Sequence, residues 1–341
     1  MTRSTLQRPR RILVTGGAGF IGANLVRRLL DDDEVDEVRV IDDRSAGDHG
    51  TLRGLPVTDI DASILDWTAL RSAVDGCEGI VHLAAMASVA ASVADPLLCH
   101  EVNVTGTLRV LDAARAAGDV PVVLASSSAV YGEHPAARKH EGLPVDPLSP
   151  YAASKLAAEG YALSYGRSYG LPVLPLRFFN VYGPHQPAGH AYAAVIPAFV
   201  EAALDGQPLV VNGDGGQTRD FVFVDTVADV ISTALRRGLT SAAAVNVASG
   251  EPTSLDQLVD VLCRVVGHPL VVHHGPERVG DIRHSRADVD RLRALVPDVA
   301  PVSLEEGLQR TVAWTRGRMA AWIALEGVAE GRDLPTMDRV P

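Results

Sequence analysis

A glycine-rich loop between a short β-branched run and an apolar helical segment constrains the fold of this chain more than any other feature. The loop Thr15–Gly22 follows the run Arg11–Thr15 and has glycines at positions 16, 19 and 22. In a strand–turn–helix unit such glycines allow a tight turn, let backbone amides approach a pyrophosphate, and let the helix pack closely on the strand. The amino-terminal end of the helix then stabilises the phosphate charge. The loop predicts a dinucleotide site formed by Gly16, Gly19, Phe20, Ile21 and Gly22.

An acidic residue stands 20 positions after Gly22 and supports this interpretation. Asp42 ends the apolar run Val38–Asp42, where its carboxylate can accept hydrogen bonds from both ribose hydroxyls of an adenosine. The same charge repels a 2′-phosphate, which favours NAD over NADP. Arg44, two residues further on, leaves NADP open as an alternative.

Strand-like and helix-like segments alternate from the start of the chain to about residue 175, which indicates an α/β protein with a parallel sheet. We expect strands at 11–15, 38–42, 56–60, 79–84, 120–126 and 172–178, and helices at 19–30, 66–74, 96–117 and 150–169. Residues 1–178 are therefore predicted to form a Rossmann-type doubly wound domain that binds NAD.

The composition of the sequence changes after residue 178. Glycine and proline become more frequent, and the predicted helices and strands become shorter. We expect residues 179–330 to form mainly a smaller α/β substrate-binding lobe, with some chain crossing back to the first domain, and residues 331–341 to form a tail. Two capping boxes, Ser254 with Gln257 and Ser303 with Glu306, predict helices within the second lobe.

Composition and charge exclude several classes of protein. With 31 Lys+Arg against 42 Asp+Glu, the 341-residue chain has a formal net charge of -11, which argues against a nucleic-acid binder. Cys77, Cys99 and Cys263 have no CxxC spacing, so neither a disulfide framework nor a metal site is indicated. The first apolar stretch is too short for a signal peptide, and the most apolar window, 79–98, contains His82 and Asp95. We expect a cytoplasmic protein that does not interact with membranes.

Three polar residues suggest redox chemistry at a sugar or alcohol carbon. Tyr151 and Lys155 are four residues apart on a predicted helix, so they lie on one face. The charge of the lysine is expected to lower the pKa of the phenol, which could then take a hydroxyl proton while a hydride leaves the same carbon. Ser127, at the end of a predicted strand, supplies a third hydroxyl.

Together these motifs make the chain resemble the extended short-chain dehydrogenase/reductases of the NAD-dependent epimerase/dehydratase family, most of all its UDP-glucose 4-epimerase branch. The resemblance runs from Arg11 to about Leu292. Its motifs are Gly16–Gly22, His82–Ala85, Asn103–Thr107, Ser126–Gly132, Tyr151 with Lys155, Arg177–Pro184, Arg219–Phe221 and Arg278–Asp281.

The resemblance implies a role for each matching residue. Tyr151 would be the base, Lys155 would tune it and bind the nicotinamide ribose, and Ser127 would hydrogen-bond the sugar O4. The other implied cofactor residues are Ser63, Ile64, Leu83, Ala84 and Ala85, with Ser63 in place of the acid that commonly contacts adenine.

The substrate residues are implied in the same way. Arg219 and Arg278 would clamp a diphosphate, Asn180 would contact the diphosphate or the sugar, and Asp281 would bind the nucleotide ribose. Ser128 would lie beside the sugar. Ser285 would line the pocket next to the C2 substituent, where a small residue leaves room for an N-acetyl group. The resemblance also implies a homodimer that pairs the helices 96–117 and 150–169.

Departures from the family pattern reduce the number of reactions that we expect of this chain. Ser128–Ala129 stands where sugar dehydratases need an acid pair, and Ala129 replaces a glutamate of the related decarboxylases. Ala90 stands where uronate-handling relatives tend to carry an arginine. We therefore expect a nucleotide-sugar 4-epimerase acting on a UDP- or dTDP-hexose with tightly bound NAD. The alternatives are a uronate 4-epimerase, a nucleotide-4-keto-deoxysugar reductase, and, from another class, a non-catalytic NAD-binding regulator.

Overall fold

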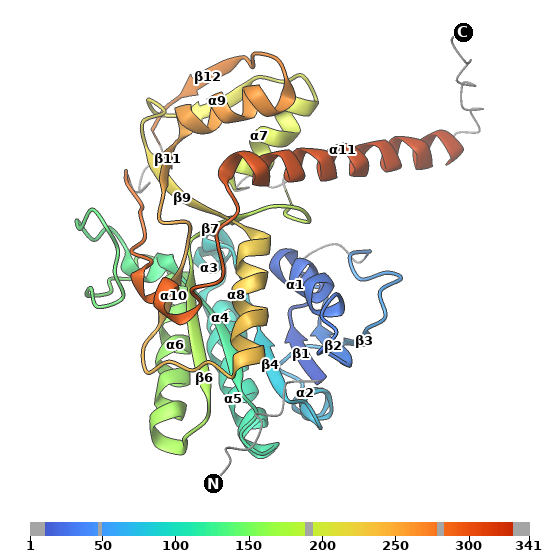
Figure 1. Ribbon diagram of the computed structural model, residues 1–341, viewed down its shortest axis with the longest axis vertical. Helices are drawn as coiled ribbons and strands as arrows, with labels where there is room; N and C mark the ends of the chain where they lie inside the picture. The colour runs from blue at the N-terminus through green and yellow to red at the C-terminus, as the bar shows by residue number, and fades with distance from the viewer. Residues whose placement is uncertain (1–10, 47–49, 188–193, 278–282, 330–341) are drawn as a thin grey trace.

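The computed structural model describes residues 11–46, 50–187, 194–277 and 283–329, without the side chains of 322–329. Its body is a seven-stranded sheet of order β10-β6-β5-β4-β1-β2-β3 (Figure 1). Every pair of neighbours in this sheet is parallel. The strands are β1 (Arg11–Thr15), β2 (Glu37–Asp42), β3 (Thr58–Asp61), β4 (Gly79–His82), β5 (Val122–Ser127), β6 (Val173–Phe178) and β10 (Val245–Val247). The sequence prediction of a doubly wound Rossmann-type sheet is confirmed.

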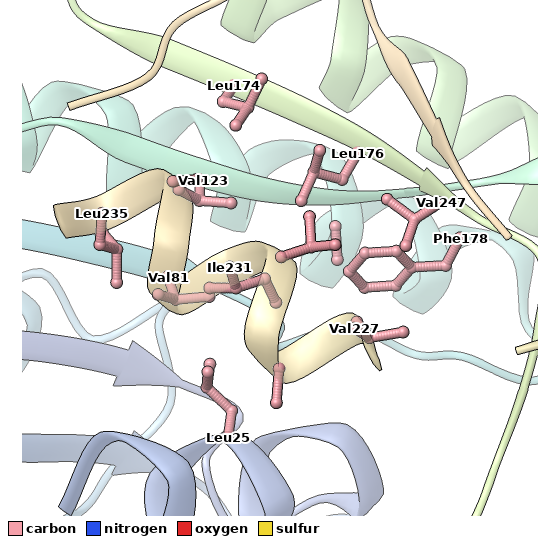
Figure 2. Packing of buried hydrophobic residues seen from close by; sticks show 14 of the residues in the cluster. Leu25, Val81, Val123, Leu174, Leu176, Phe178, Val227, Ile231, Leu235 and Val247 are labelled. Atoms are coloured by element: carbon pink, nitrogen blue, oxygen red, sulfur yellow. The ribbon is translucent and has the colours of Figure 1, made fainter. Parts of the chain in front are cut away.

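Helices cover both faces of the sheet, and residues of one strand alternate between them. Ile12 and Val14 of β1 face α1 (Phe20–Leu30) and α8 (Val224–Arg237). Leu13 faces the opposite layer, which contains α2 (Trp67–Val74), α5 (Gly106–Ala116) and α6 (Pro150–Tyr169). Figure 2 shows α8 lying with Ile231 and Val227 against the apolar side chains of the central strands. This packing holds the carboxyl ends of the strands in fixed positions.

The chain after residue 178 contributes to both parts of the molecule. Strand β10 joins the edge of the large sheet beside β6, and α8 packs on α1, where Arg28 and Asp229 form an ion pair of 2.7 Å. The short helix α10 (Asp290–Leu295) lies against β10. The chain thus crosses back to the first sheet, while a domain division at residue 178 stays a prediction.

The remaining elements form a smaller unit above the carboxyl end of the large sheet (Figure 1). Strand β9 (Thr218–Phe223) pairs with β7 (Asn180–Tyr182) and β11 (Pro252–Ser254), and β8 (Leu209–Asn212) pairs with β12 (Val272–Gly275). Helices α7 (Val195–Leu204), α9 (Leu255–Val266) and α11 (Leu304–Ala329) pack on these strands. Gly307 lets α11 pass close to Tyr182, because a Cβ there would overlap the tyrosine hydroxyl. The glycine thereby joins the last helix to the core of this unit.

The helix predicted over 96–117 is present but is not uniform. The chain is helical from Pro96 to Ala116 as α4 (Pro96–His100), a π-helical turn (Glu101–Thr105) and α5. Asn103 explains the wider turn: its side chain bonds the backbone of Met86 through both amide atoms, at 2.7 and 3.1 Å, and donates to Ser154 Oγ at 2.8 Å. These tertiary bonds fix a local winding that apolar periodicity does not reveal.

Smaller differences concern element boundaries. The strand expected at 79–84 ends at His82, the one at 56–60 lies at Thr58–Asp61, and a short helix α3 (Val89–Ala94), capped by Ser88, was missed. Both capping boxes mark helix starts as predicted. Ser254 and Gln257 make the two reciprocal bonds, and Ser303 Oγ accepts from the Glu306 amide at 3.2 Å. None of the helices in the described part of the chain combines the length and apolarity needed to span a bilayer.

Candidate active site

Most of the predicted site residues lie at one edge of the large sheet, because the carboxyl ends of parallel strands meet there. The glycine loop follows β1, Asp42 ends β2, Ser63 follows β3, Leu83 follows β4 and Ser127 ends β5. Arg278, Asp281 and the tail 331–341 lie outside the described residues. The edge brings together the predicted cofactor residues and the predicted catalytic residues.

The glycine loop fits a closely approaching phosphate group. Gly16 has φ +70°, and a Cβ there would lie 2.6 Å from the Ala84 nitrogen. At Gly22 a Cβ would overlap the carbonyl oxygen of Gly16. No side chain among the described residues caps the start of α1 at Gly19, so the first-turn amides are left for an anion. The loop has the shape and the polarity that a pyrophosphate requires.

Asp42 is buried at the end of β2 and holds the loop beside it. Its carboxylate accepts hydrogen bonds from the amides of Ala18 and Arg44, both at 2.9 Å. The side chain of Arg44 turns to an ion pair with Asp59 of β3. This pairing favours NAD over NADP, because Arg44, the nearby cation that could bind a 2′-phosphate, is engaged by another acid.

The residues after β3 and β4 complete the wall beside the loop. Ile64 is buried, and Gly106 of α5 leaves space for it, since a Cβ there would lie 2.5 Å from Ile64 Cδ1. Ser63 Oγ accepts from the Leu65 amide at 3.2 Å. The Ala84 amide donates to Thr15 Oγ1 at 3.2 Å. Leu83 and Ala84 therefore border the glycine loop, and the predicted residue Ala85 follows them in the chain.

His82 is a structural residue. Its ring nitrogens contact Thr15 Oγ1 at 2.7 Å and Thr107 Oγ1 at 2.9 Å, which joins β1, β4 and α5. Burial, with a smaller effect of the Lys155 charge, lowers the pKa of His82 to about 3. The ring is thus neutral at physiological pH and is no proton donor there.

The predicted catalytic residues come together from α6 and β5. Ser149 caps α6 by accepting from the Ala152 amide at 3.1 Å, which fixes the start of the helix just before Tyr151. The Ser127 side chain lies near enough to Tyr151 to lower the pKa of its hydroxyl. Lys155 is 6% exposed and donates from Nζ to the carbonyl oxygen of Ala125 at 3.0 Å. One helix and one strand end therefore position all three groups.

The electrostatics of the pair differ from the sequence expectation. Burial raises the pKa of Tyr151 because desolvation disfavours the phenolate, and the Ser127 side chain opposes this rise only in part. The expected lowering by the Lys155 charge is not found among the described groups that shift this pKa. Burial also lowers the pKa of Lys155 to about 8, which leaves it mostly protonated at neutral pH. Tyr151 therefore needs additional positive charge beside it to act as a base.

A cavity of about 380 Å³ opens between α7, β7, β8 and β9. Two predicted substrate residues, Asn180 and Arg219, line it together with Asn212, Gln217 and apolar side chains such as Phe199. Gln217 donates from Nε2 to the Asn212 carbonyl at 2.6 Å, and its buried Oε1 has no hydrogen-bond partner within the described ranges. The sequence analysis did not predict Gln217. The only signal for it in the sequence is its position two residues before Arg219.

The last predicted substrate residues lie beside this cavity or beside Tyr151. Ser128 opens a 3₁₀ turn (Ser128–Tyr131) directly after Ser127. Ser285 is half-buried, and its amide donates to the Thr218 carbonyl at 3.1 Å, so it runs along β9. As far as the described residues define it, the lining of the cavity does not include Ser285. Its contact with a sugar stays a prediction.

Asp220 is a second residue that sequence reasoning missed. It is fully buried, and its carboxylate accepts from Ser249 Oγ at 2.7 Å and from the Ala287 amide at 3.0 Å. These bonds tie the loop after β10 and the segment around Ser285 to the strand that carries Arg219. The motif Arg219–Phe221 was a signal for the arginine but not for this role.

Comparison with known proteins agrees with this geometry. A family model described as the NAD dependent epimerase/dehydratase family matches residues 12–248. The chain belongs to the NAD-dependent epimerase/dehydratase family. The UDP-glucose 4-epimerase of Mycolicibacterium smegmatis is 41% identical over 317 residues, which cover 90% of this chain and 99% of that protein. As a member of the epimerase/dehydratase family, the protein is an NAD-dependent enzyme.

Solved structures of relatives show the same fold. The UDP-N-acetylglucosamine 4-epimerase of Methanobrevibacter ruminantium superposes with a TM-score of 0.86 at 36% identity and covers 92% of this chain and 100% of its own. The Thermus thermophilus UDP-glucose 4-epimerase, in complex with NAD, gives a TM-score of 0.80 at 37% identity. The match covers 90% of this chain and 99% of that protein. These similarities assign the chain to the nucleotide-sugar epimerases within the epimerase/dehydratase family.

Proposed function

We propose that this protein is a nucleotide-sugar 4-epimerase, which inverts C4 of a UDP- or dTDP-hexose by transient oxidation. The observation that carries the proposal is that α6 brings Tyr151 and Lys155 to the end of β5 that bears Ser127, at the same sheet edge as the glycine loop. A non-catalytic NAD-binding regulator would not require this set of three side chains.

The described residues account for the proton transfer. The glycine loop and Asp42 would hold NAD, which would supply the acceptor and donor of the C4 hydride. Tyr151 then accepts the proton of the sugar 4-hydroxyl at Oη and returns it once the 4-keto sugar has turned over. Ser127 orients that oxygen, and the Lys155 ammonium stabilises the tyrosinate. Because the hydride and the proton both return to the sugar, the reaction is redox-neutral.

The residues after Ser127 support epimerisation over elimination of water. Ser128 and Ala129 begin the 3₁₀ turn, and neither carries an acid that could protonate a leaving hydroxyl. The Ala129 amide donates to Ser127 Oγ at 3.1 Å, so this turn also orients the serine. The nearest alternatives within the fold are a uronate 4-epimerase and a 4-ketoreductase with the same three residues.

The cavity beside β9 suits the nucleotide part of such a substrate. A 4-keto sugar must turn over in the site, so tight contacts to the sugar would slow the reaction, and binding energy has to come from the nucleotide diphosphate. Arg219 and Asn180 at the cavity are suited to that anion, and Arg278 is proposed to join them. Asp281 and Ser285 are proposed to contact the nucleotide ribose and the sugar.

The proposal includes a cytoplasmic homodimer. Several large apolar side chains of α4 and α6 are exposed, among them Leu97 at 82% and Tyr169 at 51%. These two helices belong to the segments 96–117 and 150–169 that the family resemblance pairs across a two-fold axis. The exposed apolar area supports a partner surface there.

The test is incubation of the purified protein with UDP-glucose, UDP-galactose, UDP-N-acetylglucosamine and the corresponding dTDP-sugars, with products resolved by chromatography and NMR. We expect a C4 epimer without consumption of added cofactor. With added NAD, a stoichiometric rise of reduced-nicotinamide absorbance together with a 4-keto product would show a ketoreductase acting in reverse instead. A mass spectrum of the extracted small molecules is expected to show NAD.

A further inference from the structure

Helix α6 carries a third polar side chain in line with the two already described. Glu159 follows Lys155 by four residues, as Lys155 follows Tyr151, so the three form one stripe along the helix. Glu159 is 4% exposed, and nothing in the proposed proton transfer uses it. A buried carboxylate needs hydrogen-bond partners to offset its desolvation.

The partners of Glu159 come from the two strands next to the site. Arg177 of β6 donates to Oε1 from Nη2 at 2.6 Å and to Oε2 from Nε at 2.9 Å, which makes the ion pair bidentate. Ser126 of β5 donates to Oε2 from Oγ at 2.8 Å. Ser126 and Arg177 are direct register partners in the sheet. The Glu159 carboxylate therefore joins α6 to β5 and β6 at residues that pair with each other in the sheet.

The position of Ser126 connects this fastening to the reacting groups. Its neighbour Ala125 provides the carbonyl that accepts from Lys155. Its other neighbour is Ser127, whose side chain lies near enough to Tyr151 to lower the pKa of the phenol. Glu159 thus holds the middle residue of a three-residue stretch whose outer residues act on the lysine and the tyrosine. A shift of α6 along β5 would change both contacts at once.

Arg177 is itself held in place. Its guanidinium lies over the ring of Tyr131, 4.8 Å from the centroid, and the Tyr131 hydroxyl donates to Asn246 Oδ1 of β10 at 2.7 Å. Burial opposes the charge of Arg177, but the bonds and charge of Glu159 raise its pKa above the ordinary value. The Arg177 guanidinium is therefore charged and held from both sides.

A buried ion pair of this kind adds little to stability, since the desolvation of two charges offsets most of their attraction. Its bidentate geometry instead fixes the orientation of the Glu159 carboxylate relative to the Arg177 guanidinium. A purely structural anchor at this place could be apolar, as it is elsewhere along α6, where Ala158 and Ala162 are buried. The location of the pair behind Lys155 and Ser127 points to alignment of the site.

We propose that Glu159 and Arg177 are positioning residues, which set the placement of Tyr151 and Lys155 relative to Ser127 through Ser126. The proposal rests on the proposed function for its rate measurements, but not for its spectroscopic one. The other titratable groups that bear on this site are Cys99 of α4 and His82 of β4, and neither contacts Glu159 in the described part of the structure.

The first test is Glu159→Gln, which keeps the size of the side chain and removes its charge. We expect kcat for the nucleotide sugar to fall about 10- to 100-fold, because small misplacements of catalytic groups have effects of that order, while KM changes less than about 3-fold. The acid limb of the kcat–pH profile should move to higher pH by about one unit as Lys155 stabilises the tyrosinate less.

A spectroscopic readout does not depend on the reaction. Tyrosinate absorbance is titrated in the NAD-loaded protein and in its Tyr151→Phe counterpart, and the difference reports Tyr151 alone. The same pair of titrations is made in the Glu159→Gln background. We expect the midpoint of the Tyr151 titration to lie at a higher pH there than in the protein with Glu159. An inactive wild-type protein would overturn the proposed epimerase function, whereas this comparison still tests the positioning role.

A double variant separates positioning from folding. Glu159→Met with Arg177→Met replaces the ion pair by apolar side chains, an exchange that buried pairs often tolerate without loss of stability. We expect the double variant to fold. Its kcat and the midpoint of its Tyr151 titration should still differ from the wild-type values. Recovery of both wild-type values would overturn the proposal, and so would failure of the double variant to fold, because the pair would then serve the fold itself.

The matched control is the exposed ion pair between α1 and α8. Asp229→Asn removes the 2.7 Å contact to Arg28 on the other face of the sheet. We expect unchanged kcat and an unchanged Tyr151 titration in this variant. A folded Glu159→Gln protein that behaves like the control in both measurements would also overturn the proposal.

Discussion

Lys155 donates a hydrogen bond from its ammonium group to the carbonyl oxygen of Ala125 at 3.0 Å. This bond ties the catalytic helix to the strand that ends in Ser127, two residues further on. It also keeps the ammonium buried, one helical turn from Tyr151. In the proposed mechanism the protonation of this buried lysine controls the base.

The first prediction concerns alkaline pH. Burial lowers the pKa of Lys155 to about 8, so its charge is present below that value and lost above it. We expect kcat to fall as the pH rises through about 8. Lys155→Arg should be slower but should lack this descending limb, because a guanidinium stays charged. The measurement is a kcat–pH profile of both proteins, and an identical alkaline limb in the arginine variant would assign it to another group.

The second prediction is the loss of the base in Tyr151→Phe. The phenyl ring preserves the packing, but no oxygen remains to accept the proton of the sugar hydroxyl. We expect folded protein with bound NAD and a rate at least about 100-fold lower, the usual contribution of general acid–base catalysis. Turnover and extracted NAD are measured together, and near-normal turnover would remove Tyr151 from the mechanism.

The third prediction concerns Asp42 and the choice of cofactor. Asp42→Asn should weaken NAD binding and relax discrimination against NADP, since the 2′-phosphate then meets no negative charge. The matched variant is Asp59→Asn, which releases Arg44 from its ion pair but leaves the Asp42 carboxylate in place. Dissociation constants for NAD and NADP are compared by calorimetry. If only Asp59→Asn alters selectivity, Arg44 rather than Asp42 determines the cofactor.

These predictions show which parts of the site the sequence reveals. Glycines at 16, 19 and 22 and the acid at 42 are local signals, because backbone conformation and strand ends dictate them. Tyr151 and Lys155 are likewise readable from helical spacing. The parallel sheet on which α6 packs follows from the alternation of strand-like and helix-like segments.

The remaining features depend on contacts between distant segments. The π-helical turn around Asn103 arises from bonds to Met86 and Ser154, far apart in the sequence. Glu159 meets Arg177 only because α6 crosses β5 and β6, and Asp220 collects donors from two loops more than 25 residues away. Pattern alone cannot supply such pairings, since each residue type is equally compatible with a solvated surface.

The fourth prediction links acid stability to His82. Burial lowers its pKa to about 3, below the usual value of 6.5 in an unfolded chain. The unfolded state therefore binds more protons in this range, and the stability contributed by the neutral ring is lost as the pH falls from 6.5 towards 3. His82→Gln should be less stable at pH 7 by about 1–3 kcal/mol, because its bonds to the two threonines are imperfect.

The measurement is chemical denaturation between neutral and acidic pH. The free energy of unfolding of His82→Gln should fall less steeply with decreasing pH than that of the wild type, by up to about one proton equivalent. Equal slopes would assign the acid sensitivity to other groups.

The fifth prediction is the homodimer and its face. Leu97 of α4 is 82% exposed, and a charge there should oppose burial in a dimer. We expect the wild-type protein to sediment as a dimer at micromolar concentration and Leu97→Glu to shift it towards the monomer. The control is Val271→Glu, which changes an equally apolar, 61% exposed residue in the smaller lobe and should leave the dimer intact. A monomeric wild type would refute the dimer.

The last prediction concerns the size of the sugar and rests on Ser285. Its backbone runs along β9, where its amide donates to the Thr218 carbonyl at 3.1 Å, so it follows the strand that carries Arg219. A serine there is small, and rejection of an N-acetyl group would require steric overlap. We therefore expect UDP-N-acetylhexosamines to enter the pocket as well as UDP-glucose or UDP-galactose, if the nucleotide is UDP.

Ser285→Tyr separates a residue that gates size from one outside the pocket. The larger ring should lower kcat/KM for the N-acetylated sugar by about 10-fold or more, since overpacking of a close-fitting site has an energetic cost of 1–3 kcal/mol, while the plain hexose changes little. Ser285→Ala is the matched control and should leave both sugars unaffected. An equal effect of the tyrosine on both substrates, or on neither, would mean that Ser285 does not adjoin the C2 substituent, and that any discrimination by size comes from other residues of the pocket.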